Sequence, residues 1–256
     1  MERSVEIIMV IRDRLEYTKK AIESLVKQTY FDRFNLTIWD NDSSEETKNY
    51  LRGSVWARYP FVRDVIFSEE NKPLSEVTNT LFLKSNSDLI GKVDNDVIVP
   101  PDWLERCVKA HETYDDFGFI GGFHFLPEDI ANLKPKIDTF NGIDIWRKGH
   151  IGGCSFIIKR KDFVDIGLIP TSDKILMGLS EYQHIFHKHG KVNGYLWPLI
   201  WVDHFEDVRS PNHIDNPEYN DYKWACRRMS VAEYSDRHRK NSEKYLNNNL
   251  EKEVGK

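Results

Sequence analysis

Long hydrophobic runs are missing from this sequence. The apolar segment near its start, VEIIMVI at residues 5–11, is much shorter than the roughly 20 residues that a helix needs to cross a bilayer, and no later run approaches that length. The same segment lacks the length and the cleavage site of a secretion signal. We therefore expect a cytoplasmic protein without a spanning helix.

An excess of basic residues is also missing, and cysteine is scarce. The formal net charge is -5, the sequence pI is about 6.0, and Lys and Arg are interspersed with Asp and Glu. A nucleic-acid-binding protein would normally carry a basic face, so this class is excluded. The three cysteines, Cys107, Cys154 and Cys226, are odd in number and far apart. They predict reduced thiols in a core and exclude a disulfide framework or a zinc site.

What is present is enough apolar material for one domain. A chain of 256 residues with 40% hydrophobic content can bury a sizeable core. We expect one domain over residues 1–210 and a charged helical extension with a frayed end over residues 211–256. The extension carries Arg227-Arg228 and further basic residues that could contact anionic lipid, but its alternating acidic residues favour a solvated helix.

Strands alternate with helices in the first part of the chain. Apolar residues at helical spacing follow the strand-like run 5–11 and predict a helix over residues 14–29. The same alternation then repeats, with further strands predicted at residues 34–39, 61–67 and 88–94. This pattern predicts an α/β fold with a mainly parallel sheet, in which ligands bind at the carboxyl ends of the strands.

The second part of the chain does not continue the regular alternation of strands and helices. Pro100-Pro101-Asp102 predicts the start of a helix, and residues 179–190 predict another of about three turns. Further strands are expected at residues 117–126 and 152–160, and at 192–202, where Pro198 indicates an edge or bend. Residues 126–149 are polar and weakly periodic, and we expect a long connection there.

The tripeptide Asp-Asn-Asp occurs twice, each time directly after a predicted strand, at residues 40–42 and 94–96. Two carboxylates at a strand end can bind Mg²⁺ or Mn²⁺, which prefer oxygen ligands. A calcium loop starting at Asp40 is excluded, because its sixth and twelfth positions would be Glu45 and Leu51. Two alternatives remain: a phosphatase of the haloacid dehalogenase type with Asp94 as nucleophile, and a helix cap for the first copy.

Three segments together resemble the family 2 glycosyltransferases. They are SLVKQTY with Ser24, Gln28 and Thr29, then WDNDSSEET, then KVDNDVIVPPDWLE. The resemblance covers about residues 4–205 and implies the GT-A fold, a three-layer αβα sandwich with a mixed, mainly parallel sheet. It also implies a donor-binding half over about residues 1–105 and an acceptor-binding half over about residues 106–210.

The resemblance assigns the two Asp-Asn-Asp copies to opposite ends of one sugar nucleotide. Asp40, with Asp42 as second choice, would contact the base, and Asp94 and Asp96 would bind the metal and the diphosphate. Lys92, just before the second copy, belongs with these donor-binding residues.

Three later positions complete the implied site. His204 follows the last core strand as a further metal ligand, and Gly153 belongs to a small-residue segment near the donor sugar, for which a β-bulge is the alternative. Glu181 would deprotonate the acceptor hydroxyl, although Ser180-Glu181 stands where the family usually has Glu-Asp. The histidines at positions 184, 187 and 189 have no carboxylate in register, so we expect them on a solvated helix side.

The function that follows is an inverting transfer of a hexosyl or deoxyhexosyl group. The donor would be a nucleoside-diphosphate sugar with Mn²⁺ or Mg²⁺, and the acceptor a hydroxyl of a glycan, polysaccharide or glycolipid, with peripheral membrane contact if the acceptor is lipid-borne. A non-catalytic protein that binds nucleotide sugars on the same fold is a further alternative. Four aromatic residues are equally compatible with sugar stacking and with core packing: Trp146, Tyr195, Trp197 and Trp201.

Overall fold

The computed structural model describes residues 4–214 except 31, 56–57, 132 and 172–177. Residues 215–256 lie outside this part, and with them Cys226 and nearly all of the predicted C-terminal helical extension. The predicted domain boundary near residue 210 therefore stays a prediction. Within the described residues, no helix combines the length and the apolar character that crossing a membrane requires.

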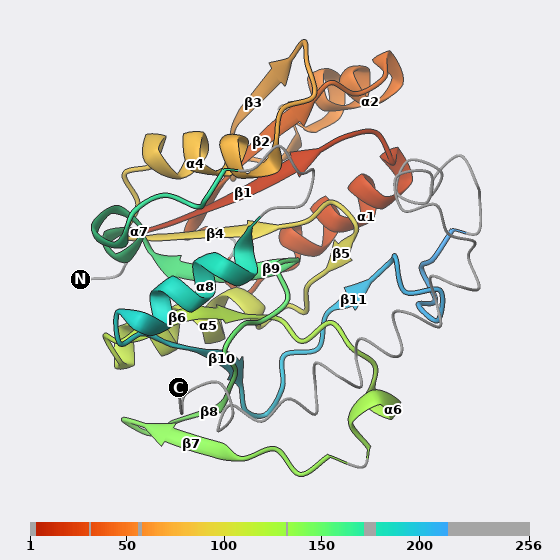
Figure 1. Cartoon of the computed structure of the whole chain (residues 1–256). Helices are drawn as coiled ribbons and strands as arrows, with labels where there is room; N and C mark the ends of the chain where they lie inside the picture. The colour runs from red at the N-terminus through yellow and green to blue at the C-terminus, as the bar shows by residue number, and fades with distance from the viewer. Residues whose placement is uncertain (1–3, 31, 56–57, 132, 172–177, 215–256) are drawn as a thin grey trace.

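A nine-stranded sheet forms the centre of the molecule, in the order β3-β2-β1-β4-β9-β6-β10-β8-β7 (Figure 1). The pairings make β8 and β9 antiparallel to the other seven strands, so the sheet is mixed and mainly parallel. Its strands are β1 Val5–Ile11, β2 Phe34–Asn41, β3 Val62–Ser68, β4 Leu89–Val93, β6 Phe117–Gly121, β7 Ile137–Phe140, β8 Ile143–Arg147, β9 Ser155–Lys159 and β10 Val192–Leu196.

Helices cover both faces of this sheet and make it a three-layer sandwich. The first core cluster contains side chains of α1, η1 and α5, and the second contains side chains of α4, α7 and α8. Along β1, Ile7 and Met9 belong to the first cluster and Ile8 to the second, as the alternation of side chains along a strand requires. The helices are α1 Leu15–Val26, α2 Glu45–Tyr50, η1 Leu51–Val55, α4 Leu74–Lys84, α5 Trp103–Thr113, α6 Pro127–Ile130, α7 Arg160–Ile166 and α8 Leu179–Lys188.

The prediction of a long connection over residues 126–149 is wrong. The segment contains the short helix α6 and an antiparallel hairpin of β7 and β8, which adds two strands to the sheet edge. Asn141 and Gly142 form the turn, both with positive φ (50° and 83°). An Asn-Gly pair between short strands is a strong hairpin signal, because both residues tolerate the left-handed backbone that a tight turn needs.

Two very short strands outside the main sheet bring distant parts of the chain together. β5 (Val97–Ile98) follows the second Asp-Asn-Asp copy and pairs antiparallel with β11 (Asp203–His204). This ribbon carries the segment after β10 back to the carboxyl end of β4, where the predicted site lies (Figure 1).

The described thiols follow the prediction of reduced core cysteines. Cys107 and Cys154 are both buried and free. Burial raises the pKa of both thiols, that of Cys154 to about 12. Neither is therefore a reactive thiolate near neutral pH.

Candidate functional site

Asp96 and His204 meet at the carboxyl end of β4. In the β5–β11 ribbon His204 lies opposite Val97, and the backbone N–H of Phe205 donates to the carbonyl oxygen of Asp96 over 2.9 Å. His204 Nε2 lies 3.7 Å from Asp96 Oδ1. The ribbon thus fixes the imidazole beside the carboxylate that the sequence predicted as its partner.

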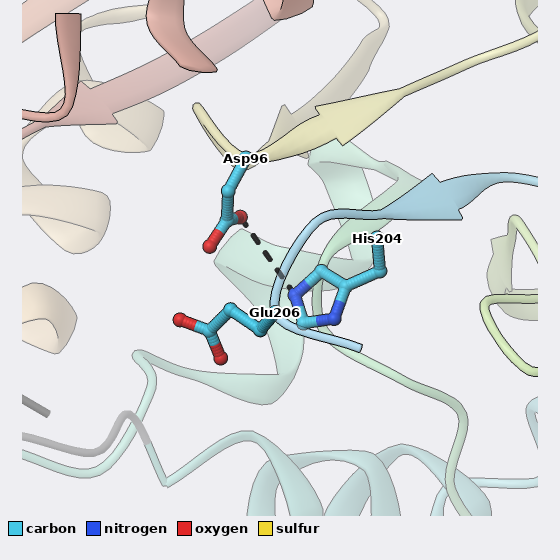
Figure 2. Close-up of side chains that lie close together, drawn as sticks. All are labelled: Asp96, His204 and Glu206. Carbon is cyan, nitrogen blue, oxygen red and sulfur yellow. Dashed lines mark ion pairs between the residues drawn. The ribbon is translucent and has the colours of Figure 1, made fainter. Parts of the chain in front are cut away.

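Glu206 completes a three-residue cluster with Asp96 and His204. Each side chain offers a ligand atom, and these atoms lie within 4.8 Å of one another (Figure 2). Asp96 and Glu206 are buried and His204 is half-buried. Two carboxylates and one imidazole form a ligand set that suits Mn²⁺. Mg²⁺ takes fewer nitrogen ligands and can use the same two carboxylates. Glu206 is absent from the predicted set, although its place two residues after His204 in VDHFED is the signal that could have identified it.

Asp94 faces a different partner. Its carboxylate forms an ion pair with the fully buried Lys92, whose Nζ also lies 3.4 Å from the carbonyl oxygen of Gly153. The backbone N–H of Asp94 donates to the Cys154 carbonyl. The structure therefore brings together three predicted donor-binding residues, Lys92, Asp94 and Gly153. Among the described residues, however, the compact ligand cluster consists of Asp96, His204 and Glu206 and leaves Asp94 out.

Asp40 lies at the carboxyl end of β2 and is completely buried. Its Oδ2 accepts a hydrogen bond from the Ser43 N–H at 3.4 Å, while its Oδ1 is buried and receives no hydrogen bond in the described structure. Burial raises the pKa of Asp40, against the lowering effect of the Ser43 hydrogen bonds and of Lys48. A buried acceptor atom without a donor is costly, which makes Oδ1 a candidate contact for a ligand N–H.

The other residues of the first Asp-Asn-Asp copy shape the surrounding loops. Asn41 accepts from the Lys72 N–H at 3.0 Å and donates to the Lys72 carbonyl at 2.9 Å, so it holds the loop after β3. Asp42, the second-choice base contact, is half-buried and adopts a positive φ of 67°. The suggested helix cap is not formed by a residue of this copy, because the N-cap position of α2 is Ser44 and no side-chain cap bond is made there.

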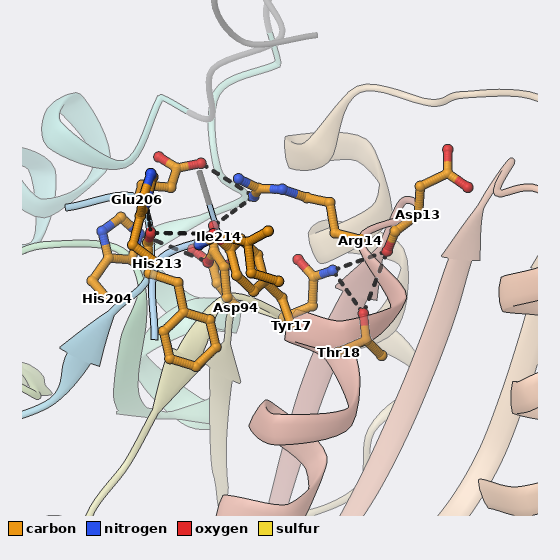
Figure 3. Close-up of polar contacts among 12 residues, drawn as sticks. Asp13, Arg14, Tyr17, Thr18, Asp94, His204, Glu206, His213 and Ile214 are labelled. Carbon is orange, nitrogen blue, oxygen red and sulfur yellow. Dashed lines mark hydrogen bonds and ion pairs between the residues drawn. The ribbon is translucent and has the colours of Figure 1, made fainter. Parts of the chain in front are cut away.

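The turn between β1 and α1 contacts the segments of both Asp-Asn-Asp copies, and Figure 3 labels Asp13, Arg14 and Thr18 on the side of the second copy. The N–H of Asp13 donates to Ser43 Oγ at 2.8 Å, and Asp13 Oδ1 accepts from the Ser44 N–H at 2.7 Å. On the other side, Asn95 Nδ2 donates to Thr18 Oγ1 at 2.9 Å. The predicted base end and the predicted metal end of the site are therefore fixed to one turn of the backbone.

Glu181 lies exposed in the first turn of α8. The helix is fixed to the Gly152-Gly153 segment, because Gln183 exchanges two hydrogen bonds with the backbone of Ile151, at 2.7 and 3.0 Å. Leu179 packs directly on Gly153, where a Cβ atom would lie 2.5 Å from its Cδ1. Since Gly153 also contacts Lys92, the start of α8 borders the Lys92–Asp94 pair.

The Gly152-Gly153 segment is not a bulge within a strand, since it precedes β9. A Cβ atom at Gly152 would lie 2.3 Å from the ring of His124. The close approach that requires glycine here is therefore one to neighbouring side chains, His124 for Gly152 and Leu179 for Gly153. Both glycines remain candidates for contact with a donor sugar.

The remaining histidines and aromatic residues divide between core and surface. Trp146 and Tyr195 are buried in the core, whereas Trp197 and Trp201 are 37% and 39% exposed. His184 and His187 are half-buried on α8, His189 is exposed, and none belongs to a ligand cluster within the described residues. Exposure limits the sugar-stacking candidates to Trp197 and Trp201.

Known proteins resemble this chain in sequence. The sequence model of the family described as "Glycosyl transferase family 2" matches residues 6–167 of this chain. A glucosyl-dolichyl phosphate glucuronosyltransferase of Haloferax volcanii is 23% identical over 184 residues, which cover 67% of this chain and 57% of that protein. Chondroitin synthase of Escherichia coli is 30% identical over 93 residues, 36% of this chain and 13% of that protein. The chain thus spans little more than half of the first of these relatives and a small part of the second.

Solved structures resemble the chain in fold. The mannosyltransferase PcManGT of Pyrobaculum calidifontis, in complex with GDP-Man and Mn²⁺, has a TM-score of 0.60 at 17% identity and covers 75% of this chain and 54% of that one. GalNAc-T7 with UDP, GalNAc and Mn²⁺ has a TM-score of 0.64 at 15% identity, and the match covers 94% of this chain and 55% of that one. These likenesses confirm the predicted GT-A fold. The family match, which extends over more than half of the chain, replaces the phosphatase interpretation of Asp94: this protein belongs to glycosyl transferase family 2.

Proposed function

We propose that this protein is a metal-dependent glycosyltransferase that moves a hexosyl or deoxyhexosyl group from a nucleoside-diphosphate sugar to a hydroxyl group, with inversion. The observation that carries the proposal is the Asp96–His204–Glu206 cluster, which lies at the same sheet edge as the buried Asp40. The two structural neighbours, which hold Mn²⁺ with GDP-Man or UDP, support this choice of donor and metal.

The acceptor in this proposal is a carbohydrate or a lipid-linked sugar. Its support is the naming of the relatives, a glucuronosyltransferase of glucosyl-dolichyl phosphate and a chondroitin synthase. Synthesis of a polysaccharide or glycolipid would place a cytoplasmic enzyme at a membrane surface that carries the acceptor. Trp197 and Trp201 are the exposed aromatic candidates for packing on its sugar rings.

The donor would lie along the carboxyl ends of β2 and β4. Asp96, His204 and Glu206 would hold Mn²⁺ or Mg²⁺, which supplies positive charge to the leaving diphosphate when bound. Asp94 and Lys92 border the same end and belong to the donor-binding set. Asp94 would join the metal ligands through Oδ2, because its ion pair with Lys92 uses Oδ1.

Asp40 would select the nucleotide base. Its buried Oδ1 can accept a hydrogen bond from the ring N–H of uracil, guanine or thymine, with Asp42 nearby as the second-choice contact. Because an ionised carboxylate accepts from the base more strongly than a protonated one, the raised pKa of Asp40 predicts weaker nucleotide binding as the pH falls through that pKa.

Glu181 would take the proton from the acceptor hydroxyl. It is exposed at the start of α8, next to the Gly153 segment, so an acceptor can reach it from solvent. We expect Glu181→Gln to lower kcat by about 10² to 10⁴ while nucleotide binding stays unchanged. Lys188→Gln at the other end of the same helix is the control. Unchanged turnover in Glu181→Gln would assign the base to another residue.

A thermal-shift panel tests the central claim. The protein is heated with UDP, GDP, CDP and dTDP sugars, each with and without Mn²⁺. A ligand that binds only the folded state raises its stability, by about 2.7 kcal/mol at a hundred times Kd. We expect a shift that needs both Mn²⁺ and a base with a ring N–H. The absence of any metal-dependent shift would refute the proposal.

Two isosteric variants separate the ends of the donor site. Asp96→Asn removes a ligand charge, and we expect the metal-dependent part of donor binding to disappear. Asp40→Asn leaves the metal cluster intact, and we expect weaker donor binding with every metal and a changed preference among bases. The same phenotype in both variants would contradict the assignment of the two Asp-Asn-Asp copies to different tasks.

A further inference from the structure

Arg14 reaches from the turn after β1 into the ligand cluster. Its Nη1 lies 2.7 Å from Asp96 Oδ2 and 3.2 Å from Glu206 Oε1. Figure 3 shows Arg14 beside Glu206. The guanidinium also lies over the ring of Tyr17, 5.1 Å from its centroid. The side chain is only 14% exposed. One buried cation thus bridges two of the three side chains that are candidate metal ligands.

The charges explain why the arginine lies there. Asp96 and Glu206 are buried carboxylates that approach each other closely, and two such charges need a nearby cation. Arg14 supplies that cation. A divalent ion bound between the same carboxylates would take over its task, and a guanidinium and a metal ion cannot both occupy the space between them.

The backbone of Asp13 and Arg14 is fixed by hydrogen bonds, whereas the long Arg14 side chain can rotate. Asp13 and Arg14 both adopt left-handed conformations, with φ of 53° and 57°, which is strained for residues other than glycine. Asp13 donates its N–H to Ser43 Oγ and accepts from the Ser44 N–H and from Asn95 Nδ2, and these hydrogen bonds keep the turn in place. A change in what Arg14 contacts would therefore be a rotation of its side chain about a fixed Cα atom.

We propose that Arg14 is a donor-binding residue that exchanges partners: it pairs with Asp96 and Glu206 in the metal-free protein and turns to the donor diphosphate when a metal ion takes these carboxylates. The inference rests on the proposed function, because it needs the cluster to bind a metal ion together with a nucleoside diphosphate. A guanidinium fork suits phosphate oxygens as well as carboxylates. A diphosphate at the metal would lie within reach of an arginine that now contacts the metal's ligands.

Partner exchange has a thermodynamic signature. A metal ion that binds alone displaces Arg14 from two carboxylates without offering it a new anion, so it binds weakly. A diphosphate provides that anion, and each ligand therefore strengthens the binding of the other. An arginine that stayed fixed in its ion pairs would repel the metal ion and attract the diphosphate, but it would add little to the coupling between them.

Binding measurements on the full chain distinguish these two cases. Free Mn²⁺ is followed by electron paramagnetic resonance in titrations with no nucleotide, with UDP and with GDP, and corrected for the Mn²⁺ complex of the nucleotide in solution. For the wild type we expect UDP or GDP to tighten Mn²⁺ binding at least about tenfold. For Arg14→Gln we expect Mn²⁺ alone to bind about tenfold more tightly than in the wild type, and the tightening by nucleotide to shrink by about tenfold.

Two further variants complete the experiment. Arg33→Gln removes an exposed arginine that precedes β2, at the other end of this strand from Asp40, and should behave as the wild type. Arg14→Lys keeps a cation but cannot form the guanidinium fork, so it should lose most of the coupling, and it decides the question if Arg14→Gln does not fold.

The possible failures are distinct. The same coupling in the wild type and the Arg14 variants would overturn the exchange while leaving the proposed function intact. A wild-type protein that binds no Mn²⁺, with or without nucleotide, would overturn both.

Discussion

Asp40 and Asp96 show how one residue type acquires different tasks from its surroundings. Both are buried aspartates at strand ends. Asp96 lies among His204, Glu206 and Arg14, which makes it part of a charged cluster. The hydrogen bonds to the Asp40 carboxylate come from Ser43, charged Lys48 and Asp13 act on it without a hydrogen bond, and one of its oxygens receives no hydrogen bond within the described structure. The first environment suits a metal ion and the second suits a neutral N–H donor.

Asp40→Asn should stabilise the protein in the absence of nucleotide. Because burial raises the pKa of Asp40, the folded state binds this proton more tightly than the unfolded chain does. The stability that this residue contributes is present below about pH 4 and is lost as the pH rises through the folded pKa. We expect the variant to exceed the wild type by roughly 1 kcal/mol at pH 7, with a smaller difference near pH 4. Urea unfolding between pH 4 and pH 8 measures this, and a less stable variant at pH 7 would contradict it.

Glu206→Gln should weaken metal binding directly. The substitution removes one of two buried carboxylates from the cluster, and we expect Mn²⁺ affinity to fall about tenfold or more. Titration with Mn²⁺ measures the loss. Glu112→Gln is the matched control, because Glu112 is exposed on α5. Equal Mn²⁺ affinity in Glu206→Gln and the control would remove Glu206 from the ligand set.

At the scale of elements, the end of α1 clamps the segment that follows the second Asp-Asn-Asp copy. Ser24 Oγ accepts from the Val99 N–H at 3.3 Å, and Gln28 donates to the Pro100 carbonyl and accepts from the Leu104 N–H, at 2.8 and 3.1 Å. The pattern of Ser24, Gln28 and Thr29, which is one of the segments that resemble the family, therefore has a structural role. It fixes β5, and β5 in turn positions β11 and His204.

Gln28→Leu should destabilise the fold through this clamp. The change leaves the buried Leu104 N–H without its acceptor and the Pro100 carbonyl with only the Trp103 N–H as donor, and we expect a loss of roughly 2 kcal/mol in the free energy of unfolding. Urea unfolding measures it, with Lys27→Gln as the control because Lys27 is exposed on the same turn. A loss no larger than that of the control would show that the clamp is dispensable.

At the scale of the whole molecule, the return of the chain after β10 joins the two halves. β11 ties this segment to β5 in the first half of the chain, and Arg209 ties it to α6 in the second half. The Arg209 guanidinium contacts Asp129 at 2.8 and 2.9 Å and Asp207 at 2.7 and 2.9 Å. Both carboxylate side chains are only 7% exposed. The segment that supplies His204 and Glu206 is therefore held from both sides.

Arg209→Gln should loosen this attachment. The variant leaves two nearly buried carboxylates without their shared cation, and we expect a loss of roughly 1 to 2 kcal/mol, since Arg209 itself is partly exposed. Arg209→Lys, which keeps the charge but not the fork, should lose less. Urea unfolding ranks the three proteins, and faster proteolysis within residues 126–136 would report detachment of α6. A ranking with Arg209→Gln equal to the wild type would exclude the tie.

The sequence by itself determined the features that depend on neighbouring residues. Hydrophobic periodicity predicted β1 through β4 and α1, and local start signals such as Pro100-Pro101-Asp102 predicted later helices, because each signal lies within or next to one element. The Asp-Asn-Asp copies were placed at strand ends for the same reason. The Asn141-Gly142 turn was equally local and was nevertheless missed, since the strands on either side of it are only four and five residues long.

Only the tertiary structure decided which distant groups meet. The pairing of β11 with β5 places His204 and Glu206 beside Asp96, and the buried Lys92 takes Asp94 as its partner. Arg14 enters the cluster from the turn after β1. None of these contacts repeats along the chain, so no local pattern encodes them. They depend on where the chain returns after β10 and on the need of each buried charge for a counter-charge within a few ångströms.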